Sequence, residues 1–102
     1  MQHMTTAEFE SLSAQDKPIL IDFFATWCGP CKMLSPVLEA VSTEYPDITF
    51  VKVDVDQEPD LARRFGITVI PTVFLLRQGK TLASRTGYMD ADQLRAFLDN
   101  AL

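Results

Sequence analysis

Residues 17–32, KPILIDFFATWCGPCK, decide the fold of this chain. The first nine are mostly β-branched, aliphatic or aromatic, which indicates a strand buried on both faces. Both cysteines of the chain follow, with two residues between them, beside the only tryptophan. Apolar residues then recur at helical spacing through residues 32–45. The stretch therefore predicts a Cys-X-X-Cys pair at a junction between a strand and a helix.

Helices and strands alternate in the rest of the chain. Thr5 and Glu8 fit a capping box that opens a short helix, and Pro36 predicts a kink in the helix after the cysteines. A strand is expected over 47–56, a helix over 59–65 ended by Gly66, and a hairpin of 72–77 and 81–86. The last helix is expected to be capped by Asp90, and its apolar stripe is Leu94, Phe97, Leu98 and Leu102. This order predicts an α/β fold, a central mixed sheet of four or five strands, parallel with an antiparallel edge hairpin, flanked by four helices.

Composition narrows the class of protein. A chain of 102 residues is expected to form a single domain, and its net charge of -5 argues against nucleic acid or an anionic membrane as a partner. We see neither a signal peptide nor an apolar run of about 20 residues, so we expect a cytoplasmic protein. A very short first strand could precede the first helix, and residues 1–3, ahead of a second methionine, Met4, could be a remnant of cloning.

The two cysteines are placed for redox chemistry. Cys28 would meet the free amide groups and the positive end of a helix dipole, which favour its thiolate and lower its pKa. Gly29 would let the backbone turn, and Pro30 suits a first helical turn. Cα atoms three residues apart on a helix lie about 5 Å apart, within the roughly 4.4–6.8 Å of a disulfide. We expect Cys28 to be the exposed attacking thiol and Cys31 the shielded resolving thiol.

Two other roles for the cysteine pair fit the sequence less well. A structural disulfide that closes so small a loop constrains the unfolded chain little. Zinc needs four ligands, and the only histidine is His3, so a site within one chain is incomplete. Two chains that share a metal through both pairs remain an alternative that nothing in the sequence favours.

Charged residues inside predicted strands are the next candidates. Asp22 interrupts an apolar strand, where a carboxyl is disfavoured, so it is a candidate general base for Cys31 with a pKa raised by burial. The alternative is an aspartate at a strand edge that faces water. Lys52 is the natural counter-charge on a neighbouring strand, unless its ammonium extends into solvent instead.

Two further residues are placed near the pair. Trp27 is expected to be partly exposed, with a role in apolar contact or in structure. Pro71 cannot donate a ladder hydrogen bond, so the strand should begin after it. Nothing in the residues around Pro71 raises a cis Ile70–Pro71 bond above its low base rate.

Over nearly its whole length the chain resembles the thioredoxin family, through DFFATWCGPCK, VDVDQEPDLARRFGI, IPT, the Gly79 turn and the glycine before the last helix. The resemblance implies the thioredoxin fold, a cis peptide before Pro71, and a first strand that is short or absent here. It also implies a catalytic set of Cys28, Cys31, Asp22 and Lys52, and a substrate-binding surface of Trp27, Gly29, Pro30, Ile70, Pro71 and Gly87. Phe24 stands where many members have a second tryptophan, and Thr26 and Tyr88 are variable-looking rim positions.

The expected function is thiol–disulfide exchange. We predict a monomeric protein-disulfide reductase without a bound cofactor, in which Cys28 forms a mixed disulfide and Cys31 releases the reduced substrate. The chain has no nucleotide motif, so the family resemblance implies recharging by a separate thioredoxin reductase, drawing on NADPH or ferredoxin-linked. The alternatives are a scaffold subunit of a larger complex with incidental redox activity, and an oxidase or isomerase that works in the opposite direction.

Overall fold

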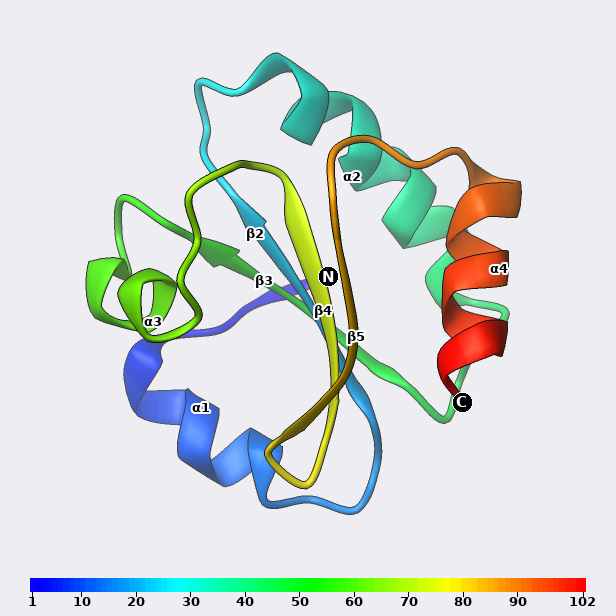
Figure 1. Cartoon of the computed structure of the whole chain (residues 1–102), viewed down its shortest axis with the longest axis horizontal. Helices are drawn as coiled ribbons and strands as arrows, with labels where there is room; N and C mark the ends of the chain where they lie inside the picture. Colours follow the sequence, from blue (N-terminus) through cyan, green and yellow to red (C-terminus); the bar gives the residue numbers. More distant parts are fainter.

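The computed structural model describes all 102 residues as five strands and four helices (Figure 1). The strands are β1 (Gln2–His3), β2 (Ile19–Phe24), β3 (Thr49–Asp54), β4 (Thr72–Arg77) and β5 (Lys80–Thr86). The helices are α1 (Thr6–Ser13), α2 (Gly29–Ser42), α3 (Pro59–Arg64) and α4 (Ala91–Ala101). None of these helices is long and apolar enough to cross a membrane.

The strands form one mixed sheet in the order β1-β3-β2-β4-β5. β2 and β1 each run parallel to β3, whereas β4 runs antiparallel to β2 and to β5. β4 and β5 are joined by a turn at Gln78 and Gly79, both with positive φ. The predicted mixed sheet with an antiparallel edge hairpin is confirmed, and β2, which precedes the cysteines, lies at its centre.

Helices cover both faces of the sheet, with α1 and α3 on one side and α2 and α4 on the other (Figure 1). Two apolar clusters fill the layers between helices and sheet. The α2 and α4 layer contains Leu20, Leu34, Leu38, Val73, Leu94 and Leu98, and the α1 and α3 layer contains Phe9, Ile19, Ile21, Phe23, Val51 and Leu61. Since both faces are covered, β2 is apolar at nearly every position, as its sequence predicted.

Strand alternation decides which layer receives Asp22. Side chains of a strand point to opposite faces in turn. Ile21 and Phe23 lie in the α1 and α3 layer and Leu20 in the α2 and α4 layer, so Asp22 faces α2. Its register partner on β3 is Lys52. The local pattern of β2 thus brings a carboxyl beneath the helix that begins at the cysteines.

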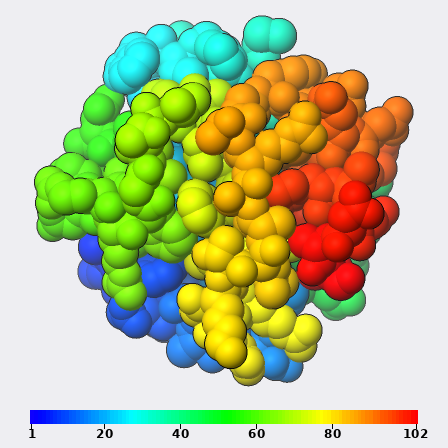
Figure 2. All heavy atoms as spheres, in the orientation of Figure 1, coloured from blue at the N-terminus to red at the C-terminus, as the bar shows by residue number.

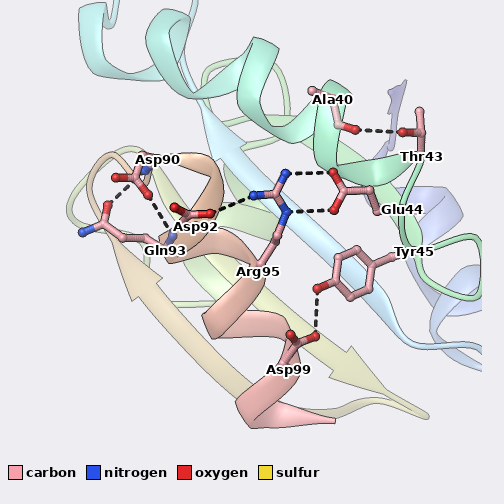
Figure 3. Close-up of polar contacts among 9 residues, drawn as sticks. All are labelled: Ala40, Thr43, Glu44, Tyr45, Asp90, Asp92, Gln93, Arg95 and Asp99. Atoms are coloured by element: carbon pink, nitrogen blue, oxygen red, sulfur yellow. Dashed lines mark hydrogen bonds and ion pairs between the residues drawn. The ribbon is translucent and has the colours of Figure 1, made fainter.

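Polar contacts join the segment directly after α2 to α4 (Figure 3). The Arg95 guanidinium donates two hydrogen bonds to the Glu44 carboxylate, at 2.8 and 2.9 Å, and holds the pKa of that carboxyl below its usual range. The Tyr45 hydroxyl donates to Asp99 at 2.8 Å. These contacts hold the chain just beyond the C-terminal end of α2 against α4, and the first residues of α2 form the cysteine site.

The structure decides three points that the sequence raised. Gln2 and His3 form β1 beside β3, a short first strand that the sequence had left open, and Met1 packs against the α2 and α4 layer. The helix after the cysteines begins at Gly29 and continues past Pro36, in agreement with the expectation that this proline does not end it. Leu102 was expected in the apolar stripe of α4, but it follows the last helical residue and is exposed.

Candidate functional site

Cys28 is the N-cap residue of α2. Its Sγ accepts the backbone N–H of Cys31 at 3.2 Å, which satisfies one of the free amides of the first helical turn. Pro30 lies in the same turn, where its missing N–H costs no hydrogen bond. Cys28 and Cys31 form a disulfide with Cα atoms 5.3 Å apart, so the predicted spacing is confirmed. The free backbone amides at the start of α2 stabilise the negative charge of a Cys28 thiolate in this position.

The exposure of the two sulfurs and the role of Gly29 differ from expectation. Cys28 is 5% exposed and Cys31 3%, so in the disulfide form the outer cysteine is hardly more accessible than the inner one. Gly29 has no left-handed φ, and a Cβ added there would meet no atom within 4 Å. The turn therefore does not require glycine at this position.

Asp22 is a buried carboxyl. It is 1% exposed, and its Oδ1 has no hydrogen-bond partner in the protein. Removal from water raises the pKa of Asp22 from an ordinary 3.8 to about 7, while the nearby positive charge of Lys52 lowers it in part. The alternative of an aspartate at a strand edge facing water is excluded, and the carboxyl can exchange a proton near neutral pH.

Lys52 lies beside Asp22 but makes no close ion pair with it. The two residues are register partners on β3 and β2, and Lys52 is half-buried. Its Nζ lies 5.4 Å from the centre of the Phe24 ring, close enough for a cation–π contact. The ammonium therefore acts on the carboxyl through its electric field and is held by an aromatic ring.

Asp22 and Cys31 line the same pocket. This pocket has a volume of about 220 Å³, and its other lining residues are Phe24, Ala25, Thr26, Lys32, Ser35 and Lys52. It lies behind the cysteine pair, on the side of the sheet that α2 covers. A small pocket shared by a carboxyl and a sulfur offers a route for a proton between them.

Trp27 extends from the site into solvent. Its side chain is 70% exposed, which confirms the expected exposure, and its indole Nε1 donates to Asp56 Oδ2 at 2.8 Å. Because this contact joins two loops 29 residues apart, it fixes the orientation of an otherwise free ring. The indole thus presents a fixed apolar surface beside Cys28.

Two loops complete the surface around the pair. The Ile70–Pro71 peptide bond is cis, as the family resemblance implied, and the Ile70 carbonyl oxygen lies 3.9 Å from Cys28 Sγ. Gly87, with φ 89°, donates its N–H to the Pro71 carbonyl at 2.8 Å. The space-filling view shows the cyan, yellow-green and orange segments of the chain meeting at one end of the molecule (Figure 2). Residues near 28, 70 and 87 thus form one continuous surface.

Comparison with known proteins points to the same family as the fold and the cysteine pair. The family model described as Thioredoxin matches residues 1–100. The chain is 43% identical to Thioredoxin-1 of Saccharomyces cerevisiae over 100 residues, which cover 98% of this chain and 97% of that one. It is 41% identical to a thioredoxin of Alicyclobacillus acidocaldarius, over 97% and 95% of the two chains.

The chain belongs to the thioredoxin family. Solved structures of family members agree: Plasmodium falciparum thioredoxin matches with a TM-score of 0.90 at 33% identity, over 97% of this chain and 98% of that one. Oxidised mitochondrial thioredoxin 3 of Saccharomyces cerevisiae matches with a TM-score of 0.87 at 38% identity, over 97% and 94%. The protein has the thioredoxin fold and is a thiol–disulfide oxidoreductase, with the Cys28–Cys31 disulfide as its redox group.

Two polar residues of this thioredoxin site were not found from the sequence. Asp56 holds Trp27, and Ser35 lines the pocket behind Cys31. The only available signal for Ser35 was its spacing, four residues after Cys31 and therefore on the same side of a helix. No feature of the sequence indicated the role of Asp56, because its contact with Trp27 depends on how two distant loops pack.

Replacement of Asp22 tests its buried state through stability. The unfolded chain ionises this carboxyl near 3.8 and the folded oxidised protein near 7. Stability contributed by the neutral carboxyl is therefore complete below about pH 4 and is lost as the pH rises through about 7. Asp22→Asn should gain stability over the parent between pH 4 and pH 8. The gain should reach roughly 4 kcal/mol, because each pKa unit between the folded and unfolded proteins corresponds to about 1.4 kcal/mol.

The measurement is urea unfolding of oxidised Asp22→Asn and parent proteins at both pH values. Asp47→Asn is the matched control, since Asp47 is exposed, and it should show no pH-dependent gain. A stability difference between Asp22→Asn and the parent that stays constant from pH 4 to pH 8 would contradict a raised pKa.

Proposed function

We propose that this protein reduces protein disulfides, with Cys28 as the nucleophile and Cys31 as the resolving cysteine. The observation that carries the proposal is the hydrogen bond from the Cys31 amide to Cys28 Sγ at the start of α2. In the reduced protein this amide and the helix dipole favour the Cys28 thiolate, which attacks a substrate disulfide. Cys31 lies one turn further along α2 and is within disulfide distance of Cys28.

The resolving step needs a proton acceptor. Cys31 must lose its proton before it attacks Cys28 Sγ and displaces the substrate thiolate. Asp22 is the proposed base, because it shares a pocket with Cys31 and has a pKa of about 7. Lys52 is the proposed modulator of that base, since its charge lowers the same pKa.

The substrate is proposed to dock on the surface around the pair. Trp27, Ile70 and Gly87 reach the surface near Cys28, whereas Pro71 is buried, and Gly29 and Pro30 form the exposed start of α2. Val69 and Tyr88, next to Ile70 and Gly87, are also exposed and apolar. An extended substrate segment can pair with the backbone at Ile70, beside Cys28 Sγ, as an added strand does.

The partners follow from the same chemistry. After each reduction Cys28 and Cys31 are left as a disulfide, so the proposal includes a separate thioredoxin reductase, either drawing on NADPH or ferredoxin-linked. A solved structure with a TM-score of 0.87 and 37% identity, over 97% of this chain and 94% of that one, concerns thiol resolution in a yeast mitochondrial 1-Cys peroxiredoxin via glutathione/thioredoxin systems. Peroxidases of this class are therefore candidate substrates.

We further propose that residues 1–102 act as one monomeric domain in the cytoplasm. Both apolar layers belong to the same sheet, and three of the exposed large apolar side chains, Trp27, Val69 and Tyr88, are assigned to substrate. A reducing compartment suits a dithiol that must return to its reduced form.

Catalytic turnover separates an electron carrier from a scaffold subunit. With NADPH and a thioredoxin reductase, a small amount of the protein should reduce a large molar excess of insulin disulfides, measured as NADPH oxidation. Cys28→Ser is the control and should abolish turnover. A parent protein that reduces no more than one equivalent would favour the scaffold, and a reduction potential near those of strong oxidants, about -120 mV, would favour an oxidase.

The roles of the two cysteines are tested by trapping. Reduced Cys31→Ser should accumulate a mixed disulfide with a substrate, because Cys28 attacks and nothing resolves the adduct. Cys28→Ser retains only the inner thiol and should form the adduct at least about tenfold more slowly, since its thiolate lacks the helix-end amide. Mass spectrometry of quenched samples gives both rates, and equal trapping by the two variants would show that the roles are misassigned.

A further inference from the structure

The pocket behind Cys31 contains a hydroxyl with no assigned role. Ser35 lies four residues after Cys31 on α2, so both side chains project from the same side of the helix. Both line the pocket of about 220 Å³ that Asp22 also lines, and Ser35 is half-buried there. Ser42 and Thr43, further along the chain, donate their hydroxyls to carbonyls three residues back, whereas Ser35 forms no such bond. Its hydroxyl is free to bind something in the pocket.

Asp22 supplies an independent reason to expect a ligand in this pocket. Its Oδ1 is buried and has no partner in the protein. A buried polar atom of this kind is normally satisfied by a donor, often an ordered water. The pocket volume of about 220 Å³ exceeds the roughly 30 Å³ that one water molecule takes up. Asp22, Ser35 and Cys31 supply the two to four polar neighbours that a buried water requires.

We propose that Ser35 positions the water that carries the proton from Cys31 to Asp22. The inference rests on the proposed roles of Cys31 and Asp22 in the resolving step. The Cys31 thiol gives its proton to this water, and the water gives one to the Asp22 carboxylate. The Cys31 thiolate then bonds to Cys28 Sγ, the bond from Cys28 to the substrate sulfur breaks, and its electron pair leaves with the substrate thiolate.

Ser35 suits this task better than the other groups that line the pocket. A hydroxyl both donates and accepts, so it can hold the water whether Asp22 is charged or neutral. The charged groups that face Asp22 are Lys52 on β3 and Lys32 on α2, and ammonium groups only donate. The neighbour of Asp22 on β4 is Val73, which does not titrate. Thr26, the other hydroxyl of the pocket, is exposed and lies in the loop after β2 and not on the helix that carries Cys31.

Stopped-flow reaction of the reduced protein with dithiobis(nitrobenzoate) tests the proposal, because it separates the two chemical steps. Attack by Cys28 releases a first coloured thiolate, and attack by Cys31 on the adduct releases a second. Ser35→Ala should slow the second release roughly tenfold near neutral pH, the loss expected when one bridging water is displaced. The first release should keep its rate and pH profile, and Ser35→Thr, which restores a hydroxyl, should recover the second.

The matched controls are Ser42→Ala and the Asp22→Asn background. Ser42 is a half-buried serine on the same helix, distant from the pocket, and its replacement should leave both releases unchanged. In Asp22→Asn the second release should already be slow, and adding Ser35→Ala should slow it little further, because water and base act in series.

The outcomes separate this inference from the proposed function. If Asp22→Asn slows the second release but Ser35→Ala does not, the role of Ser35 is overturned and the base remains. Full additivity of the two replacements also overturns it. If Asp22→Asn leaves the second release unchanged, the general base and the positioned water both fall. If the second release is as slow in Ser35→Thr as in Ser35→Ala, the effect comes from packing and the inference is overturned.

Discussion

The hydrogen bond from the Cys31 amide to Cys28 Sγ is the contact on which the site depends. Most helices are capped by an oxygen of serine, threonine, aspartate or asparagine, and here a sulfur takes that place. The cap satisfies a free amide and at the same time favours a charged sulfur. The same hydrogen bond thus caps the helix and stabilises the Cys28 thiolate. Both effects require α2 to begin at Gly29, directly after Cys28.

The rest of the fold keeps α2 in this position and places Asp22, the proposed proton acceptor, beneath it. The central strand β2 runs directly into the cysteine loop, and its alternation directs Asp22 beneath α2. A carboxyl buried there destabilises the folded protein near and above neutral pH, because it resists ionisation. That cost is consistent with a group kept for proton transfer, since an apolar residue would pack in the layer at no such cost.

Much of this arrangement follows from local sequence features. The capping boxes at Thr5 and Asp90, the hairpin turn and the order of the elements are set by neighbouring residues, and all are present. Asp22 was identified because a carboxyl within an apolar strand violates the local pattern. Contacts between distant segments were not accessible in this way. β1 is only two residues long and has no periodicity to detect, and the Trp27–Asp56 bond depends on how two loops pack.

The ionisation of the Cys28 thiol tests the central claim most directly. The measurement is the rate of alkylation of the reduced protein by iodoacetamide as a function of pH, with the modified cysteine identified by peptide mass. The thiolate stabilised at the start of α2 should give a half-maximal rate well below the pKa of about 8.5 of a free cysteine, and at Cys28 alone. A midpoint at or above that value, or equal modification of Cys31, would contradict the account.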